Sequence, residues 1–123
     1  MRIIIADDSA FVRSIMIKTL ENNFKDIEIV ACPSGKEALE AFSKTPTEWV
    51  ITDLLMPVMT GQELIKAIKE KFPMPKIIVA SADIQKATHE ELDQMGIFKY
   101  INKPLTAEKL SAIVDAIKGE NYA

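Results

Sequence analysis

Five residues with side chains suited to phosphoryl chemistry each follow a short apolar run, although they lie far apart along the chain. They are Asp7, Asp8, Asp53, Ser81 and Lys103. Carboxylates bind hard divalent cations such as Mg²⁺, and a carboxylate can also act as a nucleophile. An ammonium group and a hydroxyl group can hold the oxygens of a transferring phosphoryl group. Together these residue types indicate magnesium-dependent phosphoryl transfer to a carboxylate.

The apolar runs before these residues are typical of β-strands. Residues 3–6, 49–52 and 77–80 are near-continuous and apolar, which suits strands buried on both faces of a parallel sheet. Residues 27–30 and 98–101 carry a charge in the middle of the run, as an edge strand tolerates. The sequence therefore predicts three central strands and two edge strands.

Five segments with helical spacing of apolar residues alternate with these runs. Four have clear apolar stripes, whereas residues 84–95 have a thin one marked by Ala87, Leu92 and Met95. Helix start and stop signals agree with this division. These signals are Ser34 with Glu37, Thr60 with Glu63, Thr106 and Gly96.

Five strands alternating with five helices predict an α/β fold with a doubly wound, five-stranded parallel sheet. The flavodoxin-like strand order 2-1-3-4-5 fits the edge runs, and the pattern leaves other doubly wound orders open. Such folds bind ligands at the carboxyl ends of their strands, where we expect Asp7, Asp8 and Asp53 to meet. Three adjacent carboxylates repel one another unless a cation lies among them. No histidine or cysteine is expected nearby, which favours Mg²⁺ over zinc.

Composition limits the classes of partner and compartment. The 123 residues carry a net charge of −3, with both signs interspersed, so we expect no binding to nucleic acid or to a membrane. The single cysteine, Cys32, cannot form an internal disulfide. The amino-terminal apolar run is too short for a signal peptide or a membrane span. We therefore expect a cytoplasmic protein with one domain over residues 1–123 and no output domain.

Taken singly, each candidate residue also has a structural explanation. Aspartate after a buried strand is common in turns and helix caps. The one histidine, His89, is flanked by Glu90 and is expected to be a solvated helix residue rather than a phosphorylated one. The occurrence of all five chemical groups near predicted strand ends nevertheless favours a shared site.

In combination these motifs resemble the receiver domain of bacterial two-component response regulators, in particular the single-domain chemotaxis regulators. The matching segments are Asp7-Asp8, residues 53–57 (Asp-Leu-Leu-Met-Pro) with Gly61 beyond them, Ser81-Ala82 and Lys103-Pro104. The resemblance covers essentially the whole chain. It implies a phosphoprotein of a signal-transduction pathway that catalyses only its own phosphorylation and dephosphorylation.

The resemblance implies a role for each acidic residue. Asp53 would be the phosphoacceptor, and Asp8 and Asp53 would bind Mg²⁺ directly. Asp7 would act through a metal-bound water. The backbone carbonyl of Leu55 would complete the protein ligands.

The resemblance also implies a switch. Lys103 would pair with the phosphoryl group, and the peptide bond before Pro104 would be cis. Ser81 would hydrogen-bond the phosphoryl group and move toward it, and Tyr100 would turn into the space that Ser81 leaves. Residues 84–95, together with the last strand and the last helix, would form the surface that partners read.

Partners follow from the same resemblance. We expect a histidine kinase as phosphodonor, a downstream protein target and a monomeric protein, with chemotaxis and phosphorelay roles both open. The family tunes phosphoryl lifetime at the positions of Leu55 and Asp83. Leu55 cannot hydrogen-bond an attacking water whereas Asp83 can, so the need for a dedicated phosphatase as a further partner stays open.

Three other functions compete with this interpretation. A magnesium-dependent phosphatase with an aspartyl nucleophile needs a second carboxylate two residues after the nucleophile, where this chain has Leu55. A flavin-binding electron carrier of the same topology needs a phosphate-binding loop after the first strand, where Asp7 and Asp8 would repel phosphate. A degenerate receiver that serves only as a binding module would not be expected to retain Asp53, Lys103 and Ser81.

Overall fold

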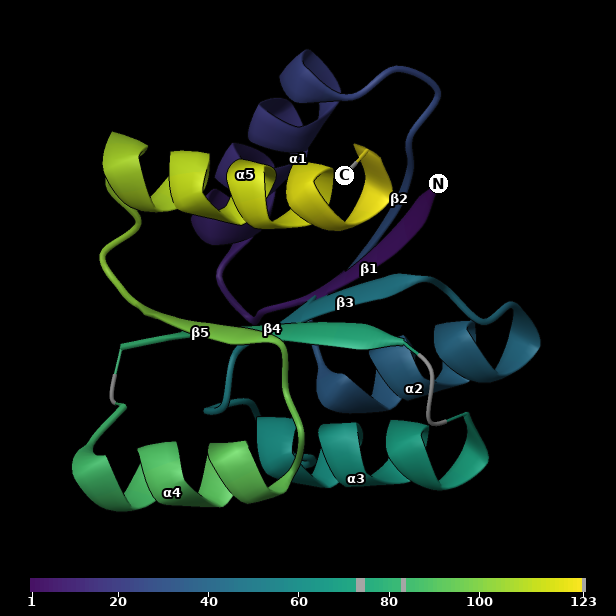
Figure 1. The fold of residues 1–123 in the computed structure, drawn as a ribbon. Coiled ribbons are helices and arrows are strands. Elements are labelled where there is room, and N and C mark those ends of the chain that lie inside the picture. The colour runs from purple at the N-terminus through teal and green to yellow at the C-terminus, as the bar shows by residue number, and fades with distance from the viewer. Residues whose placement is uncertain (73–74, 83, 123) are drawn as a thin grey trace.

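The structure, a computed structural model, describes residues 1–72, 75–82 and 84–122. Strands and helices alternate along the whole chain (Figure 1). Their order is β1 (Arg2–Ala6), α1 (Ala10–Asn23), β2 (Glu28–Cys32), α2 (Gly35–Lys44), β3 (Trp49–Thr52), α3 (Gly61–Lys71), β4 (Lys76–Ser81), α4 (Lys86–Gln94), β5 (Lys99–Asn102) and α5 (Ala107–Tyr122).

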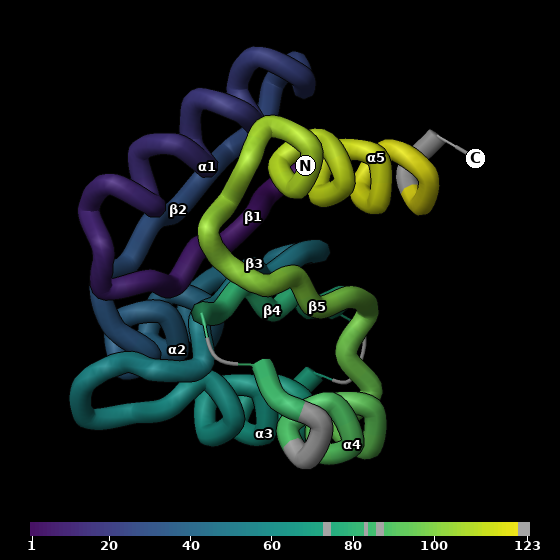
Figure 2. The backbone as a smooth tube through the Cα atoms, turned by 90° about the vertical axis from the view of Figure 1, so that its left-hand side faces the viewer, coloured from purple at the N-terminus to yellow at the C-terminus, as the bar shows by residue number. Residues whose placement is uncertain are grey.

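The five strands form one parallel sheet in the order β2-β1-β3-β4-β5, which confirms the predicted doubly wound α/β fold. Helices α1 and α5 cover one face of the sheet, and α2, α3 and α4 cover the other (Figure 1). Figure 2 looks toward the edge at which the strands end and the chain turns into the helices. Strand order reverses between β1 and β3, where folds of this kind bind ligands.

The sheet separates two apolar clusters, because successive side chains of a strand point to opposite faces. Ile4 of β1 and Val79 of β4 belong to the cluster beneath α2, α3 and α4. Ile5 and Ala80 belong to the cluster beneath α1 and α5. These four side chains are fully buried, as predicted for central strands covered on both faces.

The edge strands reach further than their apolar runs predict. Strand β2 continues to Cys32, which pairs with Ala6 of β1, and β5 continues to Asn102, which pairs with Ser81 of β4. Pairing with β1 and β4 therefore carries the edge strands β2 and β5 beyond the ends of the predicted runs. Cys32 is buried, as expected for a small apolar filler.

Helix α4 is shorter than the predicted segment 84–95 and is weakly anchored. Its N-cap residue, Gln85, makes no side-chain capping hydrogen bond. Among the α4 side chains that the structure describes, only Leu92 is buried. Gly96 follows with a φ of 70°, as expected of a left-handed cap residue. No helix in the described part of the chain combines the length and apolar composition needed to cross a bilayer.

Candidate functional site

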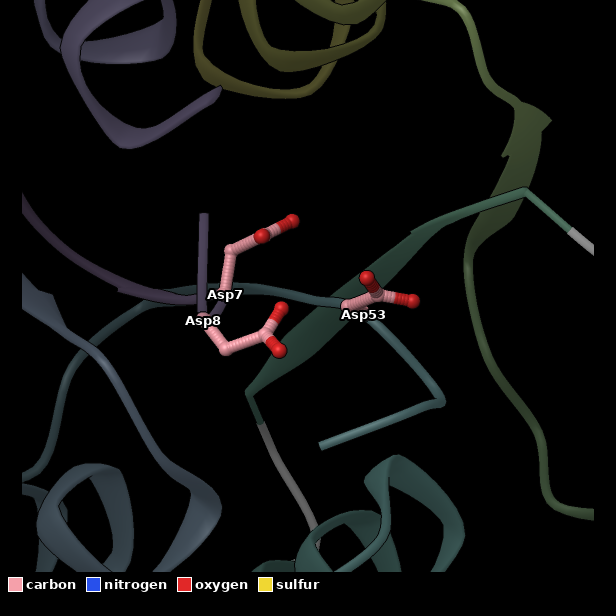
Figure 3. Close-up of side chains that lie close together, drawn as sticks. All are labelled: Asp7, Asp8 and Asp53. Carbon is pink, nitrogen blue, oxygen red and sulfur yellow. The ribbon is translucent and has the colours of Figure 1, made fainter. Parts of the chain in front are cut away.

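Three carboxylates meet where β1 and β3 end. Asp7 and Asp8 follow β1 and Asp53 follows β3, and the register Ala6↔Thr52 makes these positions neighbours. Each side chain offers an oxygen, and these oxygens lie within 4.8 Å of one another (Figure 3). Asp7 and Asp53 are 1% and 6% exposed, whereas Asp8 is open to solvent. The predicted acidic cluster is therefore formed, with one open member.

Lys103 neutralises part of this cluster. Its Nζ lies 2.8 Å from Asp7 Oδ2 and 2.8 Å from Asp53 Oδ2. Burial by itself lowers the pKa of Lys103, but hydrogen bonds and charge attraction from Asp53 and Asp7 raise that pKa above its usual value. Lys103 is therefore a fixed cation between the two buried carboxylates. The Lys103–Pro104 peptide bond is cis, as the resemblance implied.

Backbone hydrogen bonds hold the Asp53 carboxylate in place. Its Oδ1 accepts from the N–H of Leu54 at 2.6 Å and from the N–H of Leu55 at 3.3 Å. The N–H of Asp53 donates to the carbonyl of Ala6 at 2.9 Å, which ties the residue to β1. One oxygen is thus held by the following loop, and the other faces Lys103.

The side chain of Leu55 itself is 63% exposed. It lines a depression of about 330 Å³ together with Asp8, Met56, Pro57 and Thr60. The acidic cluster is therefore open to solvent on the side of Asp8.

Ser81 ends β4 with an unsatisfied hydroxyl. The residue is fully buried, and its Oγ has no hydrogen-bond partner among the described residues. A buried polar group without a partner destabilises the fold by about 1–3 kcal/mol. The adjacent backbone is satisfied, because the Ser81 carbonyl accepts from the N–H of Lys103 at 2.8 Å. The Ser81 hydroxyl is therefore available to donate a hydrogen bond at the end of β4.

His89 is less exposed than the sequence predicts. His89 was expected to be solvated, but it is half-buried, and its ring centroid lies 4.3 Å from that of Tyr100. The expectation was wrong because the neighbouring glutamates describe only the exposed face of α4, while His89 faces β5. Tyr100 is half-buried, and the structure records no hydrogen bond between it and Ser81. Asp83 lies outside the described residues.

Sequence reasoning missed two residues that support the cluster. The guanidinium of Arg13 donates to the backbone carbonyl of Asp7 at 2.7 Å. The N–H of Ser9 donates to Asp7 Oδ1 at 2.9 Å, and Ser9 also caps α1 by accepting from Val12. The available signal was an arginine six positions after Asp7, near the apolar stripe of a helix.

The donor set fits a hard divalent cation. Asp7, Asp8 and Asp53 offer only carboxylate oxygens, which Mg²⁺ prefers, and among the described residues no cysteine or histidine belongs to the cluster. One open carboxylate beside two buried ones also leaves room for retained waters. The cluster could therefore hold a metal ion.

Comparison with known proteins agrees with the geometry. The chain is 31% identical to a protein-glutamate methylesterase/protein-glutamine glutaminase of Bacillus licheniformis over 85% of this chain, but it spans only 29% of that relative's length. It is 32% identical to the chemotaxis protein CheY of Listeria monocytogenes, covering 96% of this chain and 99% of the relative.

Solved structures share the fold of this chain. The receiver domain of AraT, a response regulator from Geobacillus stearothermophilus, superposes with a TM-score of 0.85 at 29% identity, covering 97% of this chain and 93% of that one. The family model of the response regulator receiver domain matches residues 3–115. This chain therefore belongs to the response regulator receiver domain family, whose members are phosphoacceptor switches.

Proposed function

We propose that Asp53 accepts a phosphoryl group from a histidine kinase and that the modified protein changes its binding to a downstream protein. One observation carries the proposal. The Asp53 carboxylate is held by two backbone N–H groups on one oxygen and by Lys103 on the other, next to two further carboxylates. This arrangement presents a nucleophile beside a fixed cation.

The proposed metal is Mg²⁺, held by Asp8 and Asp53 directly, by Asp7 through water and by the backbone carbonyl of Leu55. When bound, Mg²⁺ supplies positive charge that offsets the charge of the phosphoryl oxygens. The chain's own residues position that site. Asp7 is kept in place by Ser9 and Arg13, and Asp53 is kept in place by the loop that follows it.

In the proposed transfer, a carboxylate oxygen of Asp53 attacks the phosphorus of the kinase phosphohistidine. A P–O bond forms as the P–N bond breaks, and the departing imidazole nitrogen takes a proton from water. The products are an acyl phosphate on Asp53 and an unmodified histidine. Lys103 remains protonated and pairs with the added phosphoryl oxygens, because its pKa is raised in this environment.

Ser81 and Tyr100 are proposed to transmit the change. The buried hydroxyl of Ser81 gains a partner when it donates to a phosphoryl oxygen, which relieves the unsatisfied group. Tyr100 lies opposite Val79 in the β4–β5 register, and Ser81 lies opposite Asn102. Side-chain alternation then puts Ser81 and Tyr100 on the same face of the sheet, within reach of each other.

Several finer proposals accompany this function. We propose that residues 1–123 constitute one receiver domain that acts as a monomer in the cytoplasm. The name of the Listeria relative places that protein in chemotaxis, which supports a motility pathway for this chain, with a phosphorelay as the alternative. A dedicated phosphatase is a further candidate partner. The alternative of a true phosphatase is less well supported, because Leu55 offers no acid–base group at the required position.

The decisive test is phosphorylation by acetyl phosphate with Mg²⁺, read by intact-protein mass spectrometry. The wild type should gain one phosphoryl group, and Asp53→Asn should gain none. Asp115→Asn, an exposed change on α5, is the matched control and should be labelled like the wild type. Labelling of Asp53→Asn to the same stoichiometry would refute the acceptor role. Sustained turnover of acetyl phosphate, many equivalents per chain, would favour the phosphatase instead.

A further inference from the structure

His89 makes an aromatic contact that the proposed phosphoryl transfer does not use. It lies on α4, and its ring packs on that of Tyr100 of β5 at a centroid distance of 4.3 Å and an interplanar angle of 43°. Its Nε2 is buried and has no hydrogen-bond partner among the described residues. The His89 ring thus contacts Tyr100, the residue proposed to transmit the switch.

Tyr100, which contacts His89, is in turn a neighbour of Ser81 on the sheet. The register Val79↔Tyr100 and Ser81↔Asn102 makes Ser81 and Tyr100 diagonal neighbours on one face of the sheet. Aromatic side chains bridge such diagonal positions. Tyr100 of β5 therefore lies between Ser81 of β4 and His89 of α4.

We propose that His89 is a positioning residue that latches Tyr100 in its ligand-free arrangement and releases it when Asp53 is phosphorylated. The proposal rests on the proposed function, because Tyr100 turns toward Ser81 only when Ser81 engages a phosphoryl group. Release of Tyr100 removes the ring contact that holds this part of α4 to β5. The latch therefore converts a side-chain rotation inside the protein into a change on the surface of α4.

Two opposing effects keep the free-energy difference between the two arrangements of Tyr100 small. The ring contact stabilises the ligand-free arrangement beyond simple burial of area. The buried Nε2 works against it, because a polar atom without a partner disfavours the buried position. Few α4 side chains are buried, since Leu92 is the only buried one among those described, and Gln62 of α3 donates to Glu91 of α4 at 3.1 Å.

Two substitutions of His89 should shift the balance between the ligand-free and activated arrangements of Tyr100 in different ways, and this contrast tests the latch. His89→Ala removes the ring contact, so it should favour the activated arrangement. His89→Phe keeps the ring and removes the unsatisfied nitrogen, so it should hold Tyr100 at least as firmly as the wild type. Glu90→Ala changes an exposed neighbour on the same helix and should have no effect.

The measurement is a titration with beryllofluoride, a phosphoryl mimic, at saturating Mg²⁺. The backbone amide of Leu54, which donates to Asp53, reports binding by ¹H–¹⁵N NMR. We expect the half-saturating concentration to fall about two- to tenfold for His89→Ala, the equivalent of one aromatic contact. It should stay level or rise for His89→Phe. Equal values for His89→Ala and the wild type, or for His89→Ala and His89→Phe, would overturn the latch.

A second readout uses the wild type alone, so it does not depend on the folding of a variant. Nuclear Overhauser contacts between the His89 and Tyr100 rings should be present without beryllofluoride and lost with it. If the Leu54 amide shifts while the ring contacts persist, the latch is wrong and the acceptor role of Asp53 stands. If beryllofluoride and Mg²⁺ leave the Leu54 amide unmoved, both the acceptor role and the latch fall.

Discussion

Gly61 lies directly against the backbone of Asp53. A Cβ atom at Gly61 would overlap the carbonyl oxygen of Asp53 and lie 2.7 Å from the Cα of Leu54. The N–H of Gly61 also donates to the carbonyl of Leu54 at 2.8 Å, which closes the loop between β3 and α3. The requirement for glycine here is therefore close approach of two backbone segments, next to the proposed acceptor.

Gly61→Ala should destabilise the protein and impair labelling of Asp53. Because the overlap is with backbone atoms, the loop must shift, and overpacking of this kind costs about 1–3 kcal/mol. Gly119→Ala is the control, since a Cβ there meets nothing within 4 Å and alanine is favoured in a helix by about 0.5–1 kcal/mol. Urea denaturation should separate the two variants in opposite directions. Equal stability would contradict the close approach.

Lys103→Met should make the stability of the protein more sensitive to Mg²⁺ than that of the wild type. Without the ammonium, Asp7 and Asp53 remain as buried charges that have lost the opposite charge of Lys103, and breaking a buried pair costs about 3–5 kcal/mol. A bound cation can restore part of this loss, because ligand binding stabilises the folded state.

Thermal unfolding with and without Mg²⁺ measures this effect. The rise in Tm on adding Mg²⁺ should be larger for Lys103→Met than for the wild type. Lys66→Met, an exposed change on α3, controls for the lost charge. An equal rise in all three proteins would argue against a shared role for Lys103 and the metal.

Arg13→Gln should weaken Mg²⁺ binding although Arg13 carries no metal ligand. Its guanidinium fixes the carbonyl of Asp7, and through it the turn that presents Asp7 and Asp8. Loss of such supporting contacts typically lowers metal affinity about 10- to 100-fold. Calorimetric titration with Mg²⁺ measures the change. Lys18→Gln on the exposed side of α1 alters net charge equally, so a matching loss there would assign the effect to charge alone.

The capping box at the start of α3 should contribute stability that depends on pH. The Thr60 N–H donates to Glu63 Oε1 at 2.9 Å, and the Glu63 N–H donates to Thr60 Oγ1 at 3.2 Å. Hydrogen bonds from the backbone and then from the side chain of Thr60 lower the pKa of Glu63. A lowered folded pKa means that the contribution is present above the unfolded pKa, about 4.3. It is lost as pH falls through the folded pKa.

Glu63→Gln should therefore be less stable than the wild type at neutral pH and equal to it in acid, as measured by urea denaturation. Glu40→Gln on α2 is exposed and should show no such dependence. Thr60→Ala should lose about 1 kcal/mol at neutral pH. A constant gap between Glu63→Gln and wild type across the pH range would contradict the role of the charged carboxylate.

The elements of the fold were readable because their signals are local. Continuous apolar runs predicted β1, β3 and β4, and Thr60 with Glu63 predicted the start of α3. The ends of β2 and β5 were not readable in the same way, because pairing with β1 and β4 extends them. The length of an edge strand depends on its neighbour as well as on its own residues.

Sequence alone determined which chemical groups end the strands, and hence that Asp7, Asp8 and Asp53 would share one edge of the sheet. Tertiary structure decided which groups touch. Lys103 bonds Asp7 across 96 positions and Asp53 across 50, the Ser81 hydroxyl has no partner among the described residues, and His89 packs on Tyr100. Strand-end positions follow from local hydrophobic spacing, whereas these contacts depend on register, helix orientation and packing between elements distant in the chain.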